Sequence, residues 1–285
     1  MIIAHLTDIH VAHERDYPSP AEAAWHPKLR KHSEELLQRL LVDLAAQDPD
    51  HVILTGDLTM TSKEEEFARA RAYLDRLLPG RRISVIPGNH DRWSAEAEAP
   101  LQQHFGDWMR CDLGRTDFPY CHLVDGVAIV ALDSSPFVAG EAPADVKGFV
   151  DAEQLDELLA IAATAEVSAR FLIVLLHHHL RLSAEDALVD DPKDPTPLVN
   201  APEVEEALGR IPVDLVLHGH RHKQMRLDLS LGDRVVPVLC PGSATRVDER
   251  PSRTGRYGLY TVEGGALGAV RHRVYEPARD AFVWG

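Results

Sequence analysis

Short apolar runs alternate with amphipathic stretches along the first third of the chain. The predicted strands lie at 2–6, 51–55 and 81–86, and the predicted helices lie at 28–47 and 62–78. Ser62 and Glu65 form an expected capping box at the start of the second helix. Alternation of this kind is typical of parallel strands joined by right-handed crossovers. The carboxyl ends of the three strands should therefore meet along one edge of a sheet.

Each of these predicted strands ends in side chains that can bind a ligand. In chain order the strands end in Asp8 and His10, in Asp57, and in Asn89, His90 and Asp91. Because one residue separates Asp8 from His10, the two side chains point the same way in extended backbone. Pro87 and Gly88 stop the third strand and turn the chain sharply. In open α/β sheets this edge is where ligands bind, so we expect a site here.

The rest of the chain predicts a second sheet. Asp125-Gly126 is a hairpin signal between two apolar runs, and a helix with leucines on one face follows at 151–165. The predicted strands of this part lie at 120–124, 127–132, 171–176, 213–217, 225–229, 235–239, 257–262 and 270–275. The acidic, proline-rich stretch at 183–202 is interpreted as a flap at the site or as a solvated surface loop. We predict one two-sheet domain spanning residues 1–285.

Histidines follow two of these later strands. The strand at 171–176 ends in His177-His178-His179, and the strand at 213–217 ends in a segment that contains His220 and His222. The collected candidates are Asp8, His10, Asp57, Asn89, one histidine of 177–179, His220 and His222. Carboxylate, amide and imidazole groups without a competing cysteine are ligands for borderline divalent metals. Seven ligands are too many for one ion, and two ions that share one carboxylate would fit.

Composition excludes some partners. The chain of 285 residues has 45 acidic and 30 basic side chains and a formal net charge of −15, which disfavours nucleic acid and anionic membranes as partners. The cysteines Cys111, Cys121 and Cys240 are widely spaced and are a poor disulfide framework. The first residues lack the basic and long apolar segments of a signal peptide. We therefore expect a cytoplasmic protein; a homo-oligomer is compatible with the sequence.

Five ordered blocks of the sequence resemble the calcineurin-like metallophosphoesterases. They are Asp8-x-His10, Gly56-Asp57, Gly88-Asn89-His90-Asp91, a histidine after an apolar strand, and Gly219-His220-x-His222. The resemblance implies an α/β fold with a two-sheet β-sandwich flanked by helices and a binuclear metal centre at one edge. It also implies a hydrolase in which two divalent ions activate water for attack on a phosphate ester.

The resemblance implies a role for each motif residue. Asp8, His10 and His222 would hold the first metal, Asp57 would bridge, and Asn89, His177 and His220 would hold the second. His90, with Asn89, would contact the substrate and help stabilise or protonate the leaving group, and Asp91 would orient the turn. His177 is preferred because it directly follows the apolar run. His178 is the alternative, because the His-His-Pro of relatives is His-His-His-Leu here. The histidines that precede the motifs, His5, His51 and His218, are interpreted as structural.

Two positions of the sequence differ from particular subgroups of this family and narrow the choice of subgroup. Purple acid phosphatases place a tyrosine three residues after the bridging aspartate, where this chain has Met60, so Mn, Fe(II) or Zn is expected rather than an iron–tyrosinate centre. Asp91 replaces the glutamate of protein Ser/Thr phosphatases. The chain is most similar to bacterial class III cyclic-nucleotide phosphodiesterases and glycerophosphodiesterases, which implies a small-molecule phosphodiester as substrate.

Three alternatives to a phosphodiesterase stay open. They are a phosphomonoesterase, a nuclease of the double-strand-break-repair type, and a catalytically silent scaffold with the same fold. The lack of a basic stripe disfavours the nuclease, and the presence of all seven ligands and His90 disfavours the scaffold. Arg246, Arg253 and Arg256 follow in a Gly/Ser-rich stretch. A solvated loop is the first interpretation for them, and contact with a phosphate or a base is the second.

Overall fold

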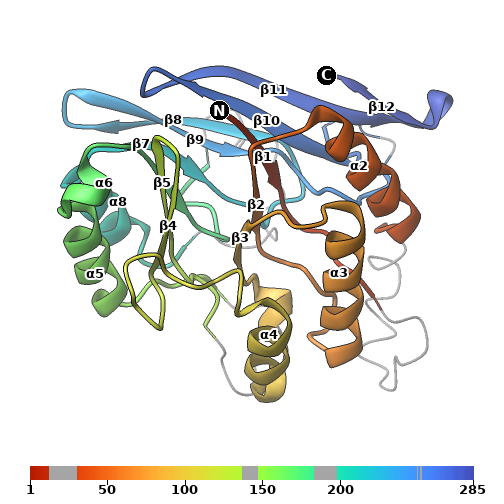
Figure 1. The fold of residues 1–285 in the computed structure, drawn as a ribbon, viewed down its shortest axis with the longest axis horizontal. Helices are drawn as coiled ribbons and strands as arrows, with labels where there is room; N and C mark the ends of the chain where they lie inside the picture. The colour runs from red at the N-terminus through yellow and green to blue at the C-terminus, as the bar shows by residue number, and fades with distance from the viewer. Residues whose placement is uncertain (13–30, 137–146, 183–197, 249, 251) are drawn as a thin grey trace.

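The chain folds into two six-stranded sheets flanked by helices (Figure 1). The computed structural model describes residues 1–12, 31–136, 147–182, 198–248, 250 and 252–285. The strand order is β12-β11-β10-β1-β2-β3 in the first sheet and β4-β5-β6-β7-β9-β8 in the second. This confirms the predicted α/β fold with a two-sheet sandwich.

The first sheet joins the parallel N-terminal strands to antiparallel C-terminal ones. Its strands are β1 (Ile2–Leu6), β2 (His51–Thr55), β3 (Ile83–Ile86), β10 (Arg256–Glu263), β11 (Ala266–Glu276) and β12 (Ala281–Trp284). β1, β2 and β3 run parallel, as the strand–helix alternation predicts, so their carboxyl ends share one edge. β12 was not expected; its four residues pair with β11 at the edge of the sheet.

The second sheet has a parallel centre between antiparallel edges. Its strands are β4 (Tyr120–Val124), β5 (Val127–Ala131), β6 (Phe171–Leu175), β7 (Val213–Leu217), β8 (Met225–Leu231) and β9 (Arg234–Cys240). β4 and β5 form the hairpin predicted at Asp125-Gly126. β5, β6 and β7 are parallel, so their carboxyl ends also share an edge.

Helices cover the sheets on both outer sides. They are α2 (Glu34–Gln47), α3 (Glu64–Leu77), α4 (Glu98–Phe105), α5 (Ala152–Ala162), α6 (Ala165–Ser168) and α8 (Ala201–Gly209), with 3₁₀ turns η1 (Asn89–Arg92), η2 (Ala95–Ala97) and η3 (Pro277–Arg279). Figure 1 shows α2 and α3 on one side and α5, α6 and α8 on the other. Among the described helices, none is long and apolar enough to cross a membrane.

Two helix starts differ from the sequence expectation. α3 has Lys63 as its N-cap, because Ser62 takes a left-handed φ of 55° and Lys63 takes the extended conformation of a cap. Glu66, rather than Glu65, closes the turn by accepting the backbone N–H of Lys63 at 3.3 Å. α2 begins at Glu34, where the Ser33 hydroxyl accepts the N–H of Leu36.

The stretch at 183–202 is the one interpreted as a flap or a surface loop. Its residues 183–197 lie outside the described residues. Its last two residues, Ala201 and Pro202, open α8. Proline is tolerated in the first turn of a helix because the N–H it lacks has no intrahelical partner there.

One apolar core is shared by both sheets. It includes Ile3 and Val52 of the first sheet and Ile129 and Val216 of the second, all fully buried. The leucines of α2 lie on one face and are buried against this core, as their spacing predicts. A rigid core beneath both sets of strand ends fixes the loops that follow them.

Candidate metal centre

The turns that follow β1, β2, β6 and β7 are hydrogen-bonded to one another. The backbone N–H of Asp8 donates to the carbonyl of Gly56 at 3.0 Å. The N–H of Gly219 donates to the carbonyl of His177 at 3.0 Å, and the N–H of His220 donates to the Asp8 carboxylate at 3.1 Å. These bonds join turns from both sheets, so the predicted site residues meet where the two sheets approach.

Left-handed backbone conformations are concentrated at this meeting point. Five predicted ligands have positive φ: Asp8 (54°), His10 (43°), Asp57 (54°), His220 (75°) and His222 (51°). Non-glycine residues seldom take this conformation, and each instance costs on the order of 1–3 kcal/mol. Strain that is held in place by surrounding packing is typical of ligand sites, so these turns are candidates for one.

Asp91 fixes the turn that follows β3. Its carboxylate accepts the backbone N–H groups of Gly88 at 2.9 Å, Leu58 at 3.1 Å and Thr59 at 2.8 Å. Burial raises the pKa of Asp91 to about 6, and the neighbouring Asp57 carboxylate adds to this rise. Asp91 thus ties the third turn to the second.

A first group of donor atoms comes from four residues. Nε2 of His10 lies 2.9 Å from Nε2 of His222 and 3.4 Å from Oδ2 of Asp57. Nε2 of His222 lies 3.2 Å from Oδ1 of Asp8. One ligand atom from each of these four residues falls within 4.8 Å of the other three, which is a separation that could hold a metal ion.

A second group lies on the other side of Asp57. Oδ1 of Asn89 lies 3.0 Å from Nε2 of His177 and 3.0 Å from Nδ1 of His220. Nε2 of His177 is also 3.4 Å from Oδ1 of Asp57. The structure therefore brings His177 to this group. His178 turns instead toward the Ser134 hydroxyl, with its Nδ1 at 3.1 Å.

Asp57 stands between the two groups, and its charge dominates the local electrostatics. Burial alone raises the pKa of Asp57, but His177, His90 and His10 outweigh it, so the pKa falls well below its usual value. Burial lowers the pKa of His177, yet the adjacent Asp57 carboxylate raises it to about 9. Without another cation, a proton on His177 therefore neutralises Asp57.

A match between the sequence and a family model decides which family the chain belongs to. A family model described as calcineurin-like phosphoesterase matches residues 1–224, which contain both donor groups. The chain belongs to the calcineurin-like phosphoesterase family. No curated protein has a significant sequence match to it.

Solved structures show the same fold. Purple acid phosphatase PPD1 from yellow lupin (Lupinus luteus) is similar at a TM-score of 0.66 and 13% identity, over 99% of this chain and 52% of that chain. The sulfate thiohydrolase SoxB of Thermus thermophilus is similar at a TM-score of 0.53 and 14% identity, over 99% of this chain and 58% of that chain. This calcineurin-like phosphoesterase thus spans little more than half the length of either protein. At such low sequence identities, the structural similarity establishes the fold alone.

The donor set of this calcineurin-like phosphoesterase fits divalent cations. Asp8, Asp57 and Asn89 supply oxygen and the histidines supply nitrogen, with no thiolate among them. Burial holds the pKa of His10 and of His220 well below the usual histidine value, so both imidazoles are neutral and keep a lone pair. The Nδ1–H of His177 donates to the carbonyl of Thr55 at 2.7 Å, which leaves Nε2 as its ligand atom.

His90 lies next to the donor atoms but faces a different partner. Its Nδ1–H donates to the carbonyl of Met60 at 2.7 Å, and its backbone N–H donates to Oδ1 of Asp57 at 3.0 Å. The ring lies beside that of His10, with ring centroids 4.7 Å apart. Nδ1 is therefore held by the carbonyl of Met60, and Nε2 is the ring nitrogen that remains for other partners.

The three histidines interpreted as structural have partners elsewhere. His5 contacts the Thr55 hydroxyl at 2.8 Å, and His51 contacts the Ser84 hydroxyl at 2.8 Å. Nδ1 of His218 lies 3.1 Å from the carbonyl of Gly219. None of the three belongs to either donor group.

Sequence reasoning missed two neighbours of the first donor group. His32 falls inside the helix predicted at 28–47, so a search for ligands at predicted strand ends could not find it. Its ring centroid lies 4.3 Å from that of His10. Arg246 contacts Nδ1 of His222 at 3.3 Å and pairs with Asp248 at 2.9 Å. Arg246 and Arg256 are buried, so the solvated-loop interpretation is wrong for these two arginines.

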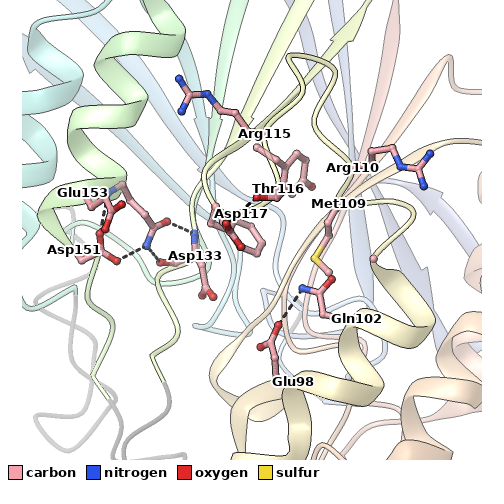
Figure 2. Close-up of a pocket in the computed structure, with 14 residues that line it drawn as sticks. Glu98, Gln102, Met109, Arg110, Arg115, Thr116, Asp117, Asp133, Asp151 and Glu153 are labelled. Atoms are coloured by element: carbon pink, nitrogen blue, oxygen red, sulfur yellow. Dashed lines mark hydrogen bonds between the residues drawn. The ribbon is translucent and has the colours of Figure 1, made fainter.

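A separate polar cleft of about 610 Å³ lies between α4 and the start of α5. Figure 2 shows Glu98 and Gln102 on one side of it, Asp151 and Glu153 on the other, and Asp133 between them. Neither donor group lines this cleft. It is therefore distinct from the candidate metal centre.

Proposed function

We propose that this protein is a binuclear metal-dependent phosphodiesterase that hydrolyses small phosphodiesters, with cyclic nucleotides as the first substrates to test. The observation that carries the proposal is the position of Asp57. Its Oδ2 lies 3.4 Å from His10 and its Oδ1 lies 3.4 Å from His177, so each oxygen faces a different donor group. A carboxylate placed in this way is suited to bridge two cations.

The two donor groups would each hold one ion. Asp8, His10 and His222 would hold the first, Asn89, His177 and His220 would hold the second, and Asp57 would contact both. Bound Mn²⁺, Fe²⁺ or Zn²⁺ would activate water and neutralise the charge of the phosphate oxygens. This local positive charge would offset the net charge of −15 that otherwise repels an anionic substrate.

His90 would act on the leaving group. Because Met60 holds its Nδ1–H, a protonated His90 presents its second N–H from Nε2. That proton can pass to the departing oxygen of the ester, which lowers the barrier for a poor leaving group. Asp91 would be a positioning residue, since its carboxylate holds the turn that carries His90 and Asn89.

Charge favours a diester over a monoester. A phosphodiester carries one negative charge at neutral pH, whereas a monoester carries close to two. Arg246 contacts the predicted ligand His222, and Asp248 pairs with Arg246 and offsets its charge. Because the charge of Arg246 is already offset, we expect the site to prefer the less charged substrate.

The test compares two chromogenic substrates on the metal-loaded chain. We expect bis(p-nitrophenyl) phosphate to be hydrolysed with Mn²⁺ more efficiently, in kcat/KM, than p-nitrophenyl phosphate. Hydrolysis of the monoester alone would identify a phosphatase instead. Binding of ions without any turnover would identify a silent scaffold. A panel of cyclic nucleotides and glycerophosphodiesters would then define the natural substrate class.

A further inference from the structure

His32 lies beside the first donor group although it belongs to none of the motif blocks. One ligand nitrogen from each of His10, His32 and His222 lies within 4.8 Å of the other two. The ring centroid of His32 is 4.3 Å from that of His10 and 5.1 Å from that of His222. Two nitrogens bound to one ion at about 2.0–2.1 Å can be up to about 4.2 Å apart, so small shifts would place all three on one ion.

The hydrogen bonds of Thr245 determine the tautomer of His32. The Thr245 hydroxyl lies 2.9 Å from the carbonyl of Ile9, which can only accept, so the hydroxyl proton is donated there. The same oxygen lies 2.9 Å from Nδ1 of His32 and must accept from it. Nδ1 therefore carries the proton, and Nε2 of neutral His32 carries a lone pair. A histidine fixed in this way through its other nitrogen is typical of metal ligands.

Backbone bonds hold His32 in place. The N–H of Ser33 donates to the carbonyl of Thr245 at 3.0 Å, and the N–H of Val247 donates to the carbonyl of Lys31 at 2.6 Å. His32 and Arg246 form an antiparallel bridge between these bonds. The segment that carries His32 is thus attached on both sides to the loop that also carries Arg246, the neighbour of His222.

We propose that His32 is a further ligand of the ion that Asp8, His10 and His222 would hold. This inference rests on the proposed binuclear function. His32 would raise the number of imidazoles in the first site to three. Imidazole suits Zn²⁺ and Fe²⁺, whereas Mn²⁺ prefers oxygen donors. His32 would therefore raise the affinity of the first site for Zn²⁺ relative to its affinity for Mn²⁺. A residue that only packs against the site would not change this selectivity.

The test measures metal binding without any substrate. Isothermal titration of the metal-free full chain with Zn²⁺ and with Mn²⁺ gives the affinity of each site for each ion. In His32→Ala we expect Zn²⁺ binding at one site to weaken by about ten- to hundredfold, the range seen when partners of metal ligands are removed. Mn²⁺ binding should weaken less, and the second site should be unchanged. His104→Ala, which removes a histidine on α4 that pairs with Glu64 at 3.7 Å, is the control and should bind as wild type.

The visible absorption of the Co²⁺-loaded protein provides a second readout, because its band intensities depend on the number and kind of ligands. If His32→Ala does not fold, His32→Gln keeps a side-chain donor for Thr245 but removes the imidazole, and the same losses are expected. Wild-type affinity and an unchanged Co²⁺ spectrum in the folded variant would overturn the role of His32 as a ligand. They would leave the proposed function in place. A wild-type chain that binds no divalent ion would overturn the proposed function as well.

Discussion

Nε2 of His10 lies 2.9 Å from Nε2 of His222, although 212 residues separate the two histidines in the chain. His10 follows β1 in the first sheet, and His222 follows β7 in the second. An ion held by both would therefore join the two sheets. Metal binding and stability should be linked for this reason.

Removal of the metals should destabilise the protein. A ligand that binds only the folded state adds about 2.7 kcal/mol to the free energy of unfolding when its free concentration is 100 times its dissociation constant. We expect the melting temperature to fall on treatment with EDTA and to recover on addition of Mn²⁺ or Zn²⁺. Calorimetry would measure both changes. Identical melting with and without metal would contradict a link between the sheets through bound ions.

The variant Asp57→Ala should lose both bound ions and nearly all activity. Each oxygen of the Asp57 carboxylate faces one donor group, so its loss removes a ligand from both sites at once. Elemental analysis of the purified variant would give the number of metals per chain. His104→Ala serves again as the control. Retention of two metals per chain in Asp57→Ala would rule out the bridging role.

His90→Ala should keep the metals but slow turnover. Its side chain hydrogen-bonds to Met60 rather than to either donor group, so the affinity for metal should change little. Loss of proton transfer typically slows a reaction by about 10²–10⁴-fold, and kcat should fall by that amount. The loss should be smaller for p-nitrophenol esters than for alkyl esters, because p-nitrophenolate needs less protonation. Equal rates in the variant and the wild type would remove His90 from the mechanism.

Gly88→Ala should damage the centre through steric conflict. A Cβ at position 88 would collide with Oδ1 and N of Asp57 and with the His177 ring. The φ of Gly88 is −107°, which any residue can adopt, so this crowding and not the backbone conformation is the obstacle to a side chain here. Overpacking of this kind costs about 1–3 kcal/mol, and we expect metal affinity to fall as well. Gly126→Ala is the matched control, since nothing lies within 4 Å of a Cβ there. Similar metal affinity in both variants would show that Asp57 and His177 can move apart freely.

The free energy of unfolding should fall in acid through two histidines far from the metal centre. The Ser84 hydroxyl lies 2.8 Å from His51 and 2.8 Å from His122. Burial lowers the pKa of His51 to about 4 and that of His122 to about 3. The unfolded chain takes up these protons below pH of about 6.5, and the folded chain does not. Stability should therefore be full above that pH and should be lost as pH falls toward 3.

Urea titrations of the metal-free protein at several pH values would measure this loss. Each histidine contributes a slope on the order of 1 kcal/mol per pH unit inside the window. His122→Gln removes one of the two groups, so the decline between pH values of about 5.5 and 4 should be shallower than in wild type. An unchanged slope in the variant would show that His122 does not titrate on unfolding.

Much of the architecture could be predicted from the sequence because its signals are local. β1 and β2 lie at the predicted positions, since short apolar runs bounded by turn residues are read directly from the chain. The parallel arrangement followed from the alternation of strands and helices, and with it the expectation that Asp8, Asp57 and Asn89 would meet. Boundaries that depend on a single backbone torsion, such as the N-cap at Lys63 instead of Ser62, could not be predicted in this way.

Only the tertiary structure decided which neighbours each turn residue has. His177 and His178 are adjacent and chemically identical, but only His177 turns toward Asn89, because successive side chains point in different directions. His32 and Arg246 reach His222 through a bridge between segments more than two hundred residues apart in the chain. The sequence by itself determined the chemical groups and the ends of strands that carry them. Their distances and partners depend on packing between distant segments, and only the folded chain determines that.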